Sequence, residues 1–485
     1  FITFMSPNLN FCCMKSRSLL LLTALILLFS TTQLFSQNGF KITINIKKLP
    51  DTIAFLGSYY GENMTVDDTA LITKPGMVIF EGNQTLDGGV YFIVDQDKIK
   101  LFEFVVDETQ VFDLTTDTLD YINHMKVKGS AENDIFFDYQ QTSSKLFSDI
   151  QELRQLKAKI TTQDSMDWVD KQIQAVNEEN VAYKLNFLEE QPDHILTLIF
   201  NASKEPVVPD SLKGNSLELR KKAYRYYKSH YWDNIDLTDP RILKTPLFHS
   251  KVDKYFSQVI QKSPDSIIME IDKVMLKCKG NDPVYEYLAW YFTATYESAS
   301  IMGYDKIFVH MVDEYFKDRD HDWVSETMYE SLIERADKIR PILIGNFAPE
   351  LILIDTNNNF KSLYDVHHDY VVIFFWTTTC NECKKELKHL DELYHSKAID
   401  MQVFSVNTDT SFNKWKSFIK EQSLDWVNVN GTKSISRDYH ILYDIYKTPT
   451  LFVIDKEKRT IAKHLSAEQI IGFVEKHEKF KMSPN

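Results

Sequence analysis

The sequence predicts a multidomain protein, in which a small all-β sandwich-like domain precedes an all-α domain and a C-terminal α/β domain. Short, mostly apolar runs bounded by turn residues fill residues 37–130. Apolar residues at three- and four-residue spacing dominate residues 131–340. Strand and helix patterns then alternate over residues 341–485, which is typical of a mixed sheet covered on both faces.

Length and composition agree with this division. A chain of 485 residues is long enough for about three domains. Its hydrophobic fraction of 44% and charged fraction of 26% are ordinary for a folded protein. The net charge of −14 argues against nucleic acid as a partner.

Residues 1–36 have the pattern of a secretory signal peptide. Residue 1 is Phe, and Met14 offers a better start, because two basic residues and the apolar run 19–29 follow it. A run of this length is too short to cross a bilayer comfortably. We therefore expect export with cleavage after Ser36, and the alternative is a chain anchored by an uncleaved N-terminal segment.

The β domain is expected to contain several short strands, which predicts a small sandwich. The expected strands are residues 41–46, 77–80, 90–94, 101–106 and 111–114. The acidic pair Asp67-Asp68 between them is interpreted as solvated loop charge and not as a metal site.

The central domain is expected to be a set of packed helices separated by prolines. The expected helices are residues 146–159, 181–188, 213–227, 255–260, 267–277, 284–296 and 306–316. Their apolar faces favour a helix–helix core over a peptide-binding surface. Cys278 falls on this pattern and is interpreted as a small buried hydrophobe, with a free reactive thiol as the alternative.

The C-terminal domain begins after a linker at residues 341–349. The expected strands are residues 351–354, 371–376, 401–406, 450–454 and 460–463. One expected helix begins beside Cys383, and two others cover residues 412–421 and 435–446. The last begins at Ala467, where Ser466 and Gln469 form a capping box.

Two cysteines, Cys380 and Cys383, lie where the buried strand 371–376 becomes a helix. A helix N-terminus has unpaired N–H groups and a partial positive charge, so it stabilises a thiolate and lowers the pKa of Cys380. Cys383, one turn further on, is placed to attack a mixed disulfide at Cys380. Glu386 lies within a turn of Cys383 and could exchange a proton with it.

Three other interpretations of the cysteine pair are weaker. A zinc site needs a second Cys or His pair at ligand spacing, and none follows, so we expect no metal. A purely structural disulfide with two intervening residues closes a small, strained ring that stabilises little. A peroxidase is suggested by Thr377, three residues before Cys380, but the proline that should stand at position 373 is Ile.

Pro449 opens the expected strand 450–454. A proline suits the first position of a strand because it cannot donate to the ladder. In the cis form it would present the backbone of Thr448 to an incoming chain. A trans proline that merely starts the strand is the alternative.

Residues 341–485 resemble the ResA/TlpA type of extracytoplasmic thiol-disulfide oxidoreductases. The resemblance is carried by Ala348-Pro349, Phe375-Trp376, Cys380-Asn381-Glu382-Cys383, Lys384-Lys385-Glu386 and Thr448-Pro449-Thr450. It implies a thioredoxin fold with a nucleophilic Cys380, a resolving Cys383, Pro449 in cis and Glu386 as the active-site carboxylate. It also implies substrate contacts at Trp376, Thr379, Thr448 and Pro449.

Residues 40–130 and 131–340 resemble two uncharacterised domains that precede such a thioredoxin domain in exported proteins of some Gram-negative bacteria. Those domains bring no known activity with them. Together with the signal peptide, this resemblance leads us to expect a periplasmic protein.

The motif departs from that family at two positions. Thr379 replaces the usual tryptophan before the first cysteine, and Glu382 replaces the usual proline before the second. We expect Asn381 and Glu382 to tune the redox pair. A carboxylate at Glu382 should raise the thiol pKa values and favour a reductase-like poise.

Two hypotheses follow. In the first, the protein reduces disulfides of a cell-envelope protein at Cys380, is recharged by a membrane thiol donor, and needs no cofactor beyond the Cys380–Cys383 disulfide. In the second, the two N-terminal domains bind a cell-envelope protein or saccharide, and the thioredoxin domain is an accessory.

Overall fold

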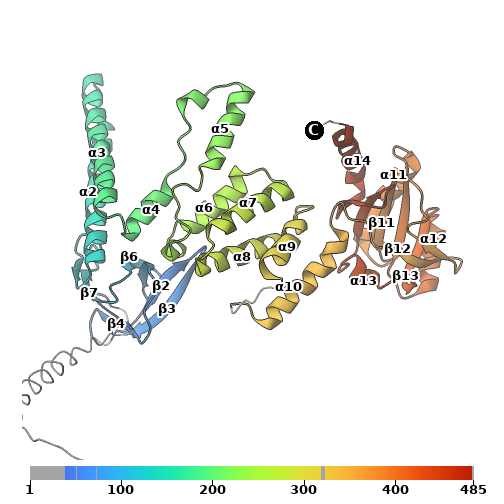
Figure 1. Cartoon of the computed structure of the whole chain (residues 1–485), viewed down its shortest axis with the longest axis horizontal. Coiled ribbons are helices and arrows are strands. Elements are labelled where there is room, and N and C mark those ends of the chain that lie inside the picture. Colours follow the sequence, from blue (N-terminus) through green and yellow to red (C-terminus); the bar gives the residue numbers. More distant parts are fainter. Residues whose placement is uncertain (1–38, 51, 73, 318–322, 483–485) are drawn as a thin grey trace, which may run out of the picture. The chain divides into compact units, whose positions relative to one another are not determined.

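The computed structural model describes residues 39–50, 52–72, 74–317 and 323–482 (Figure 1). The predicted signal peptide, with its start at Met14, lies outside these residues. These described residues pack as two compact units, one made of residues up to 201 with 244–246, and the other of residues 202–243 with those from 247 onward. Within the described part of the chain, no helix is both long and apolar enough to cross a membrane.

The first unit is built on two four-stranded sheets, as the predicted sandwich requires. One sheet has the strand order β4-β1-β7-β8 and the other the order β3-β2-β5-β6. The strands are β1 (Phe40–Lys47), β2 (Ile53–Tyr60), β3 (Asn63–Leu71), β4 (Met77–Gly82), β5 (Gly89–Val94), β6 (Lys100–Val106), β7 (Val111–Asp117) and β8 (Lys126–Lys128). Alternate residues of each sheet point into one shared core.

Three of these strands, β2, β3 and β8, were not predicted. The acidic pair lies on β3 and not in a loop, because Asp68 pairs with Leu56 of β2 and Asp67 occupies the bulge beside it. β3 is an edge strand with mostly exposed residues. Charges on such a strand keep its free edge from pairing with another chain.

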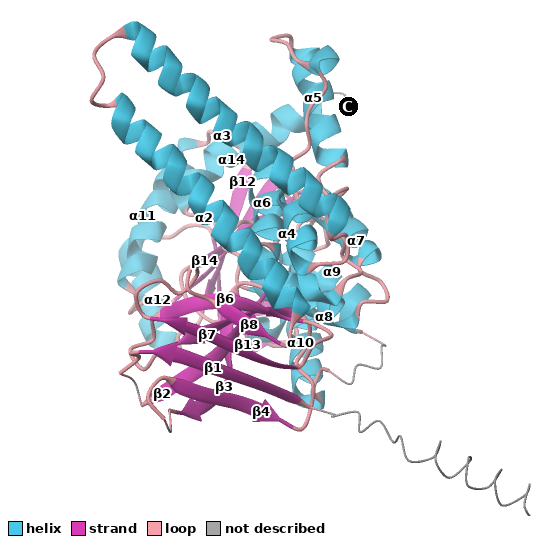
Figure 2. Ribbon diagram, turned by 90° about the vertical axis from the view of Figure 1, so that its left-hand side faces the viewer, coloured by secondary structure: helices cyan, strands magenta, loops and turns pink. Residues whose placement is uncertain are grey.

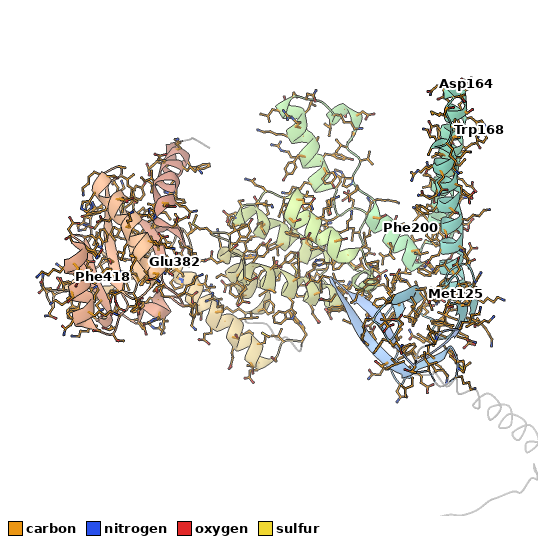
Figure 3. The ribbon with its side chains drawn as sticks, turned by 180° about the vertical axis from the view of Figure 1, so that it is seen from behind. Met125, Asp164, Trp168, Phe200, Glu382 and Phe418 are labelled. Atoms are coloured by element: carbon orange, nitrogen blue, oxygen red, sulfur yellow. A yellow bond between two sulfur atoms is a disulfide. The ribbon has the colours of Figure 1, made fainter. Side chains whose placement is uncertain are left out.

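A long helical hairpin stands on this sandwich, made of α2 (Ala131–Lys157) and α3 (Gln163–Glu190). Figure 2 shows the two helices running antiparallel, and Figure 3 places Asp164 and Trp168 at the end far from the strands. The predicted helix 181–188 lies within α3, and the predicted helix 146–159 overlaps the C-terminal part of α2 and runs two residues past its end. Phe136, Phe137 and Phe187 share the core of the sheets, so the base of the hairpin is anchored there.

The second unit begins with helices that agree with the predicted all-α region. They are α5 (Leu217–Ser229), α6 (Phe248–Lys254), α7 (Pro264–Lys277), α8 (Asp282–Glu297), α9 (Asp305–Met311) and α10 (Glu326–Ile339), after α4 (Ile195–Ser203) at the end of the first unit. Cys278 is fully buried, as predicted, and burial raises the pKa of its thiol to about 12. It is therefore an unreactive packing residue.

The C-terminal part of this unit is a seven-stranded mixed sheet with the order β10-β9-β13-β12-β11-β14-β15. Its strands are β9 (Ile352–Asp355), β10 (Phe360–Ser362), β11 (Tyr370–Trp376), β12 (Met401–Asn407), β13 (Val427–Ser434), β14 (Thr450–Asp455) and β15 (Thr460–Lys463). The helices are α11 (Asn381–Ser396), α12 (Phe412–Gln422), α13 (Tyr439–Leu442) and α14 (Ala467–Met482). Strand β11 pairs in parallel with β12 and antiparallel with β14.

Strand β11 is buried on both faces, as its continuous apolar sequence predicts. Val372, Phe374 and Trp376 belong to the core beneath α11, α12 and α14. Ile373 and Phe375 belong to the core on the opposite face. The end of β11 is therefore a rigid point from which the cysteine motif emerges.

One predicted helix in this domain was wrong in its extent. Instead of a helix at 435–446, the chain forms the four-residue α13, which Asp438 caps by accepting the N–H of His440 at 2.9 Å. Ile435 lies in a bend after β13, and its N–H donates to the carbonyl of Ile352, the first residue of β9, at 3.0 Å. Asp444 has a left-handed backbone with φ of 54°, which no helix can include.

The attachment of α2 to the edge strand β6 gives a stability prediction. The amide of buried Asn133 accepts the N–H of Val105 at 2.9 Å and donates to its carbonyl at 2.7 Å. Asn133→Ala leaves both backbone groups unpaired, so we expect the free energy of unfolding of this unit to fall by about 2–3 kcal/mol. Urea denaturation of the full chain, with the transition assigned by hydrogen exchange of β6 amides, measures it. The exposed Asn186→Ala is the control, and equal effects of both variants would contradict the prediction.

Candidate active site: a disulfide at the start of a helix

Cys380 and Cys383 form a disulfide at the junction of β11 and α11. Their Cα atoms are 5.2 Å apart. Cys380 is the N-cap of α11, with extended backbone angles, and its Sγ accepts the N–H of Cys383 at 3.1 Å. The helix begins here because the sulfur takes the place that a Ser or Asp oxygen has in an ordinary N-cap.

The two sulfur-bearing residues differ in accessibility. Cys380 is half-buried, whereas Cys383 is fully buried among Leu387 and Leu390 of the helix core. An incoming disulfide can reach only the outer residue without a rearrangement. This asymmetry agrees with Cys380 as the attacking thiol and Cys383 as the resolving one.

A second loop closes the site from the neighbouring strand. The Thr448–Pro449 peptide bond is cis, as the resemblance implied, and β14 starts at the next residue. The carbonyl oxygen of Thr448 lies 3.6 Å from the Sγ of Cys380. Since Thr450 pairs with Phe375, the sheet register itself brings this loop beside the cysteines.

Glu386 lies one turn after Cys383 on α11 and is partly buried. Its carboxylate accepts the N–H of Ala467, the first residue of α14, at 2.7 Å. The side chain therefore caps α14 while it shares a helix face with Cys383. The structure brings this residue to the site, and its part in proton transfer stays a prediction.

The remaining motif residues are exposed to solvent. Asn381, Glu382 and Thr379 are exposed, and Figure 3 labels Glu382 in the first turn of α11. Its carboxylate forms an ion pair with Lys385 at 2.8 Å. Both partners are about two-thirds exposed, so solvent and Lys385 weaken the field of Glu382 at the cysteines without removing it.

Trp376 is placed differently from what the predicted substrate contact requires. Its side chain is fully buried, its indole N–H donates to the Ser405 hydroxyl at 2.7 Å, and its ring packs against Phe374 and Phe418. No face of the indole is open to a substrate in this structure. The residue instead anchors the end of β11 immediately before the motif.

Sequence reasoning missed a polar network under the motif. The carboxylate of Asp409 accepts the N–H of Thr378 at 2.8 Å and a side-chain N–H of Asn407 at 3.0 Å. The side-chain NH2 group of Asn430 donates to the side-chain oxygen of Asn407 at 3.1 Å and to the backbone carbonyl of Asp409 at 3.1 Å. These residues hold the loop before Cys380. The signal that could have revealed them is the pair Asn407 and Asp409 at the end of a strand parallel to β11.

A mixed sheet with a Cys-X-X-Cys disulfide at a helix N-terminus beside a cis-proline defines a thioredoxin-like domain. Residues 344–463 match the model of the AhpC/TSA family. The thiol-disulfide oxidoreductase ResA of a Bacillus cereus strain is 28% identical over 159 residues, which covers 32% of this chain and 87% of that protein. ResA of Bacillus subtilis (strain 168) is 29% identical over 136 residues, with coverages of 28% and 73%.

Among solved structures, a domain of a possible thiol-disulfide isomerase from Cytophaga hutchinsonii is 36% identical. The match covers 30% of this chain and 99% of that domain, with a TM-score of 0.28. From the family model and the identities with ResA, the C-terminal part of this chain is a thioredoxin-like domain of the thiol-disulfide oxidoreductase class.

The regions before this domain match family models that carry no activity. Residues 40–136 match DUF4369 and residues 170–340 match DUF5106, both of which are domains of unknown function. The predicted boundaries at 130/131 and 340/341 stay predictions.

The geometry around Glu382 yields a pH prediction. Glu382→Gln removes a negative charge from the first turn of α11 and frees Lys385, and both changes favour the thiolate. We expect the pKa of Cys380 in the reduced protein to fall. The pH profile of alkylation by iodoacetamide measures it. Glu392→Gln, near the other end of α11, is the control, and an unchanged pKa in Glu382→Gln would show that solvent screens this carboxylate fully.

Proposed function

We propose that this protein is an extracytoplasmic thiol-disulfide oxidoreductase that reduces disulfides of partner proteins through Cys380. One observation carries the proposal: the half-buried sulfur of Cys380 lies between a helix N-terminus and the Thr448 carbonyl, with Cys383 buried beneath it. This is the geometry that a mixed disulfide at the outer cysteine and its resolution from below require.

The reaction starts from the reduced dithiol. The Cys380 thiolate attacks one sulfur of the substrate disulfide, forms a mixed disulfide and releases the other substrate sulfur as a thiolate. Cys383 loses its proton and attacks the Sγ of Cys380, which restores the intramolecular disulfide and releases the second substrate thiol. Two electrons pass from the protein to the substrate.

The loop at Thr448 has a role in docking the substrate. The carbonyl of Thr448 lies beside the sulfur of Cys380, where the backbone of Thr448 can pair with an extended substrate segment. Thr379, exposed beside the motif, contributes to the same surface. Substrate recognition therefore depends on backbone contacts as much as on side chains.

The protein needs an external source of electrons after each turnover. The Cys380–Cys383 disulfide must be reduced by another dithiol, and a membrane thiol donor is the class of partner that fits an exported protein. Export to the periplasm is supported by the apolar segment near the N-terminus of the sequence.

The alternative function is binding of a cell-envelope component by the N-terminal regions, and one observation favours it. The hairpin of α2 and α3 exposes large apolar side chains along its length, namely Phe147, Trp168, Val181 and Leu185. Single exposed apolar residues are common, but several of them on one helical hairpin suggest a contact surface.

Trapping of a partner separates the two functions. Cys383→Ser removes the resolving thiol, so we expect disulfide-linked adducts at Cys380 that dithiothreitol releases. Non-reducing electrophoresis of the full chain, expressed with its signal peptide in a bacterium, measures them. Cys380→Ser/Cys383→Ser is the control and should lose every adduct. Binding that persists in this double variant would favour the alternative.

Glu386 gives a second test of the redox mechanism. Glu386→Gln retains an oxygen that accepts the N–H of Ala467 but removes the proton acceptor beside Cys383. We expect resolution of the mixed disulfide to slow by at least roughly tenfold. Stopped-flow reaction of the reduced protein with a peptide disulfide measures the second phase. If Glu386→Gln resolves at the normal rate and only Glu386→Ala is impaired, the residue is a helix cap alone.

A further inference from the structure

A residue of the helical region reaches the loop that carries the cis-proline. Arg335, on α10, donates to the Asp444 carboxylate at 2.6 Å and to the Tyr446 hydroxyl at 3.2 Å. Its guanidinium also lies 5.5 Å from the centre of the Tyr446 ring. These contacts tie α10 to the segment 444–449, which leads directly into the redox site.

Asp444 is largely buried beside Arg335. Its side chain is only 10% exposed, and its second carboxylate oxygen has no hydrogen-bond partner among the described residues. Its backbone has a φ of 54°, which a residue with a Cβ adopts only when the surroundings hold it there. Arg335 supplies the opposite charge that a largely buried carboxylate requires.

The segment between Asp444 and Pro449 is short and fixed at both ends. On one side, the hydroxyl of buried Tyr443 donates to the Pro349 carbonyl at 2.6 Å. On the other, the hydroxyl of Thr450 donates to the Lys447 carbonyl at 2.8 Å. A shift at Asp444 therefore passes along a few residues to the Thr448 carbonyl.

The same helical region holds the next strand of the sheet as well. Asp305, the first residue of α9, forms an ion pair with the buried Lys463 of β15, and the sulfur of Met302 accepts the N–H of Lys463 at 3.4 Å. Strand β15 pairs with β14, which begins after Pro449. Two separate contacts thus fix the part of the domain that carries the cis-proline.

We propose that Arg335 is a positioning residue for the redox site, through which the helical region sets the place of the Thr448 carbonyl beside Cys380. The proposal rests on the function proposed above, because it concerns the surface on which a protein disulfide docks. It gives the helical region, which has no assigned activity, a defined task in the reaction. Arg335 touches neither the substrate nor the cysteines.

The first test compares two arginines in the full chain. Arg335→Gln removes the contact with the loop. Arg340→Gln removes a similar contact within the helical region, since Arg340 is 35% exposed against 30% for Arg335 and pairs with Asp313. We expect the KM for reduction of insulin disulfides to rise about tenfold in Arg335→Gln alone, because the docking loop is misplaced. The rate with a small disulfide, oxidised glutathione, should change by less than about twofold, because it needs little of the docking surface.

A charge exchange tests the pair itself. Arg335→Asp combined with Asp444→Arg restores the opposite charges with their places reversed. We expect the KM of this double variant for insulin to return most of the way from the raised values of the single variants to the wild-type value. If the KM of the double variant rises by as much as the two single substitutions combined, the proposed pairing is overturned.

Hydrogen exchange separates this proposal from the proposed function. The amides of residues 445–448 should exchange at least roughly tenfold faster in Arg335→Gln than in Arg340→Gln, whether or not insulin is reduced. Unchanged protection, or equal loss with insulin and with glutathione, would overturn the positioning role. A wild-type chain that reduces no insulin while Arg335→Gln still loosens the loop would refute the proposed function and leave the loop contact standing.

Discussion

The hydrogen bond from the Cys383 N–H to the Cys380 sulfur, at the first turn of α11, is the contact on which the site depends. It converts an unpaired backbone donor into a binding group for sulfur. For this to work, the helix must begin at one fixed residue. The strand before it supplies that fixed point, since β11 lies inside a seven-stranded sheet and is buried on both faces.

Polar groups beneath the motif also hold it in place. Buried backbone amides need partners, and the loop from Thr377 to Thr379 has no strand beside it to provide them. The carboxylate of Asp409 accepts the backbone N–H of Thr378 and a side-chain N–H of Asn407. The side chain of Asn430 in turn donates to the side-chain oxygen of Asn407. The ends of three parallel neighbours, β11, β12 and β13, are thereby joined on the side where the chemistry takes place.

The sequence predicted the elements whose pattern is local and missed those that depend on distant partners. Strand β11 was found because its apolar run has no other interpretation. Strand β13 was missed because Asn428 and Asn430 disfavour a strand, yet the side-chain NH2 group of Asn428 donates to the carbonyls of Leu424 and Trp426 in the core. Packing and side-chain hydrogen bonding override propensity there.

Among the active-site residues, too, those with a local signal were predicted and those that depend on distant partners were not. The two cysteines could be located because cysteines at the start of a helix suit redox chemistry. The proline could be located because it opens a strand, where it need not donate a hydrogen bond. Trp376 was misplaced because a tryptophan beside a redox motif suggests a surface contact, whereas Ser405 and two aromatic rings hold it in the core. Arg335 gave no signal, because an arginine on an amphipathic helix is usually solvated and its partner lies 109 residues away.

The balance of charge at the first turn of α11 decides how the pair behaves as a redox couple. The helix N-terminus acts on Cys380 at hydrogen-bond distance, whereas Glu382 acts through solvent and is already paired with Lys385. Because the helix N-terminus is the nearer of the two, we expect it to outweigh Glu382 and to favour the thiolate. Because Glu382 opposes that preference, we expect the reduced form to be less stabilised than it would be with a neutral residue, and the couple to be correspondingly the better electron donor.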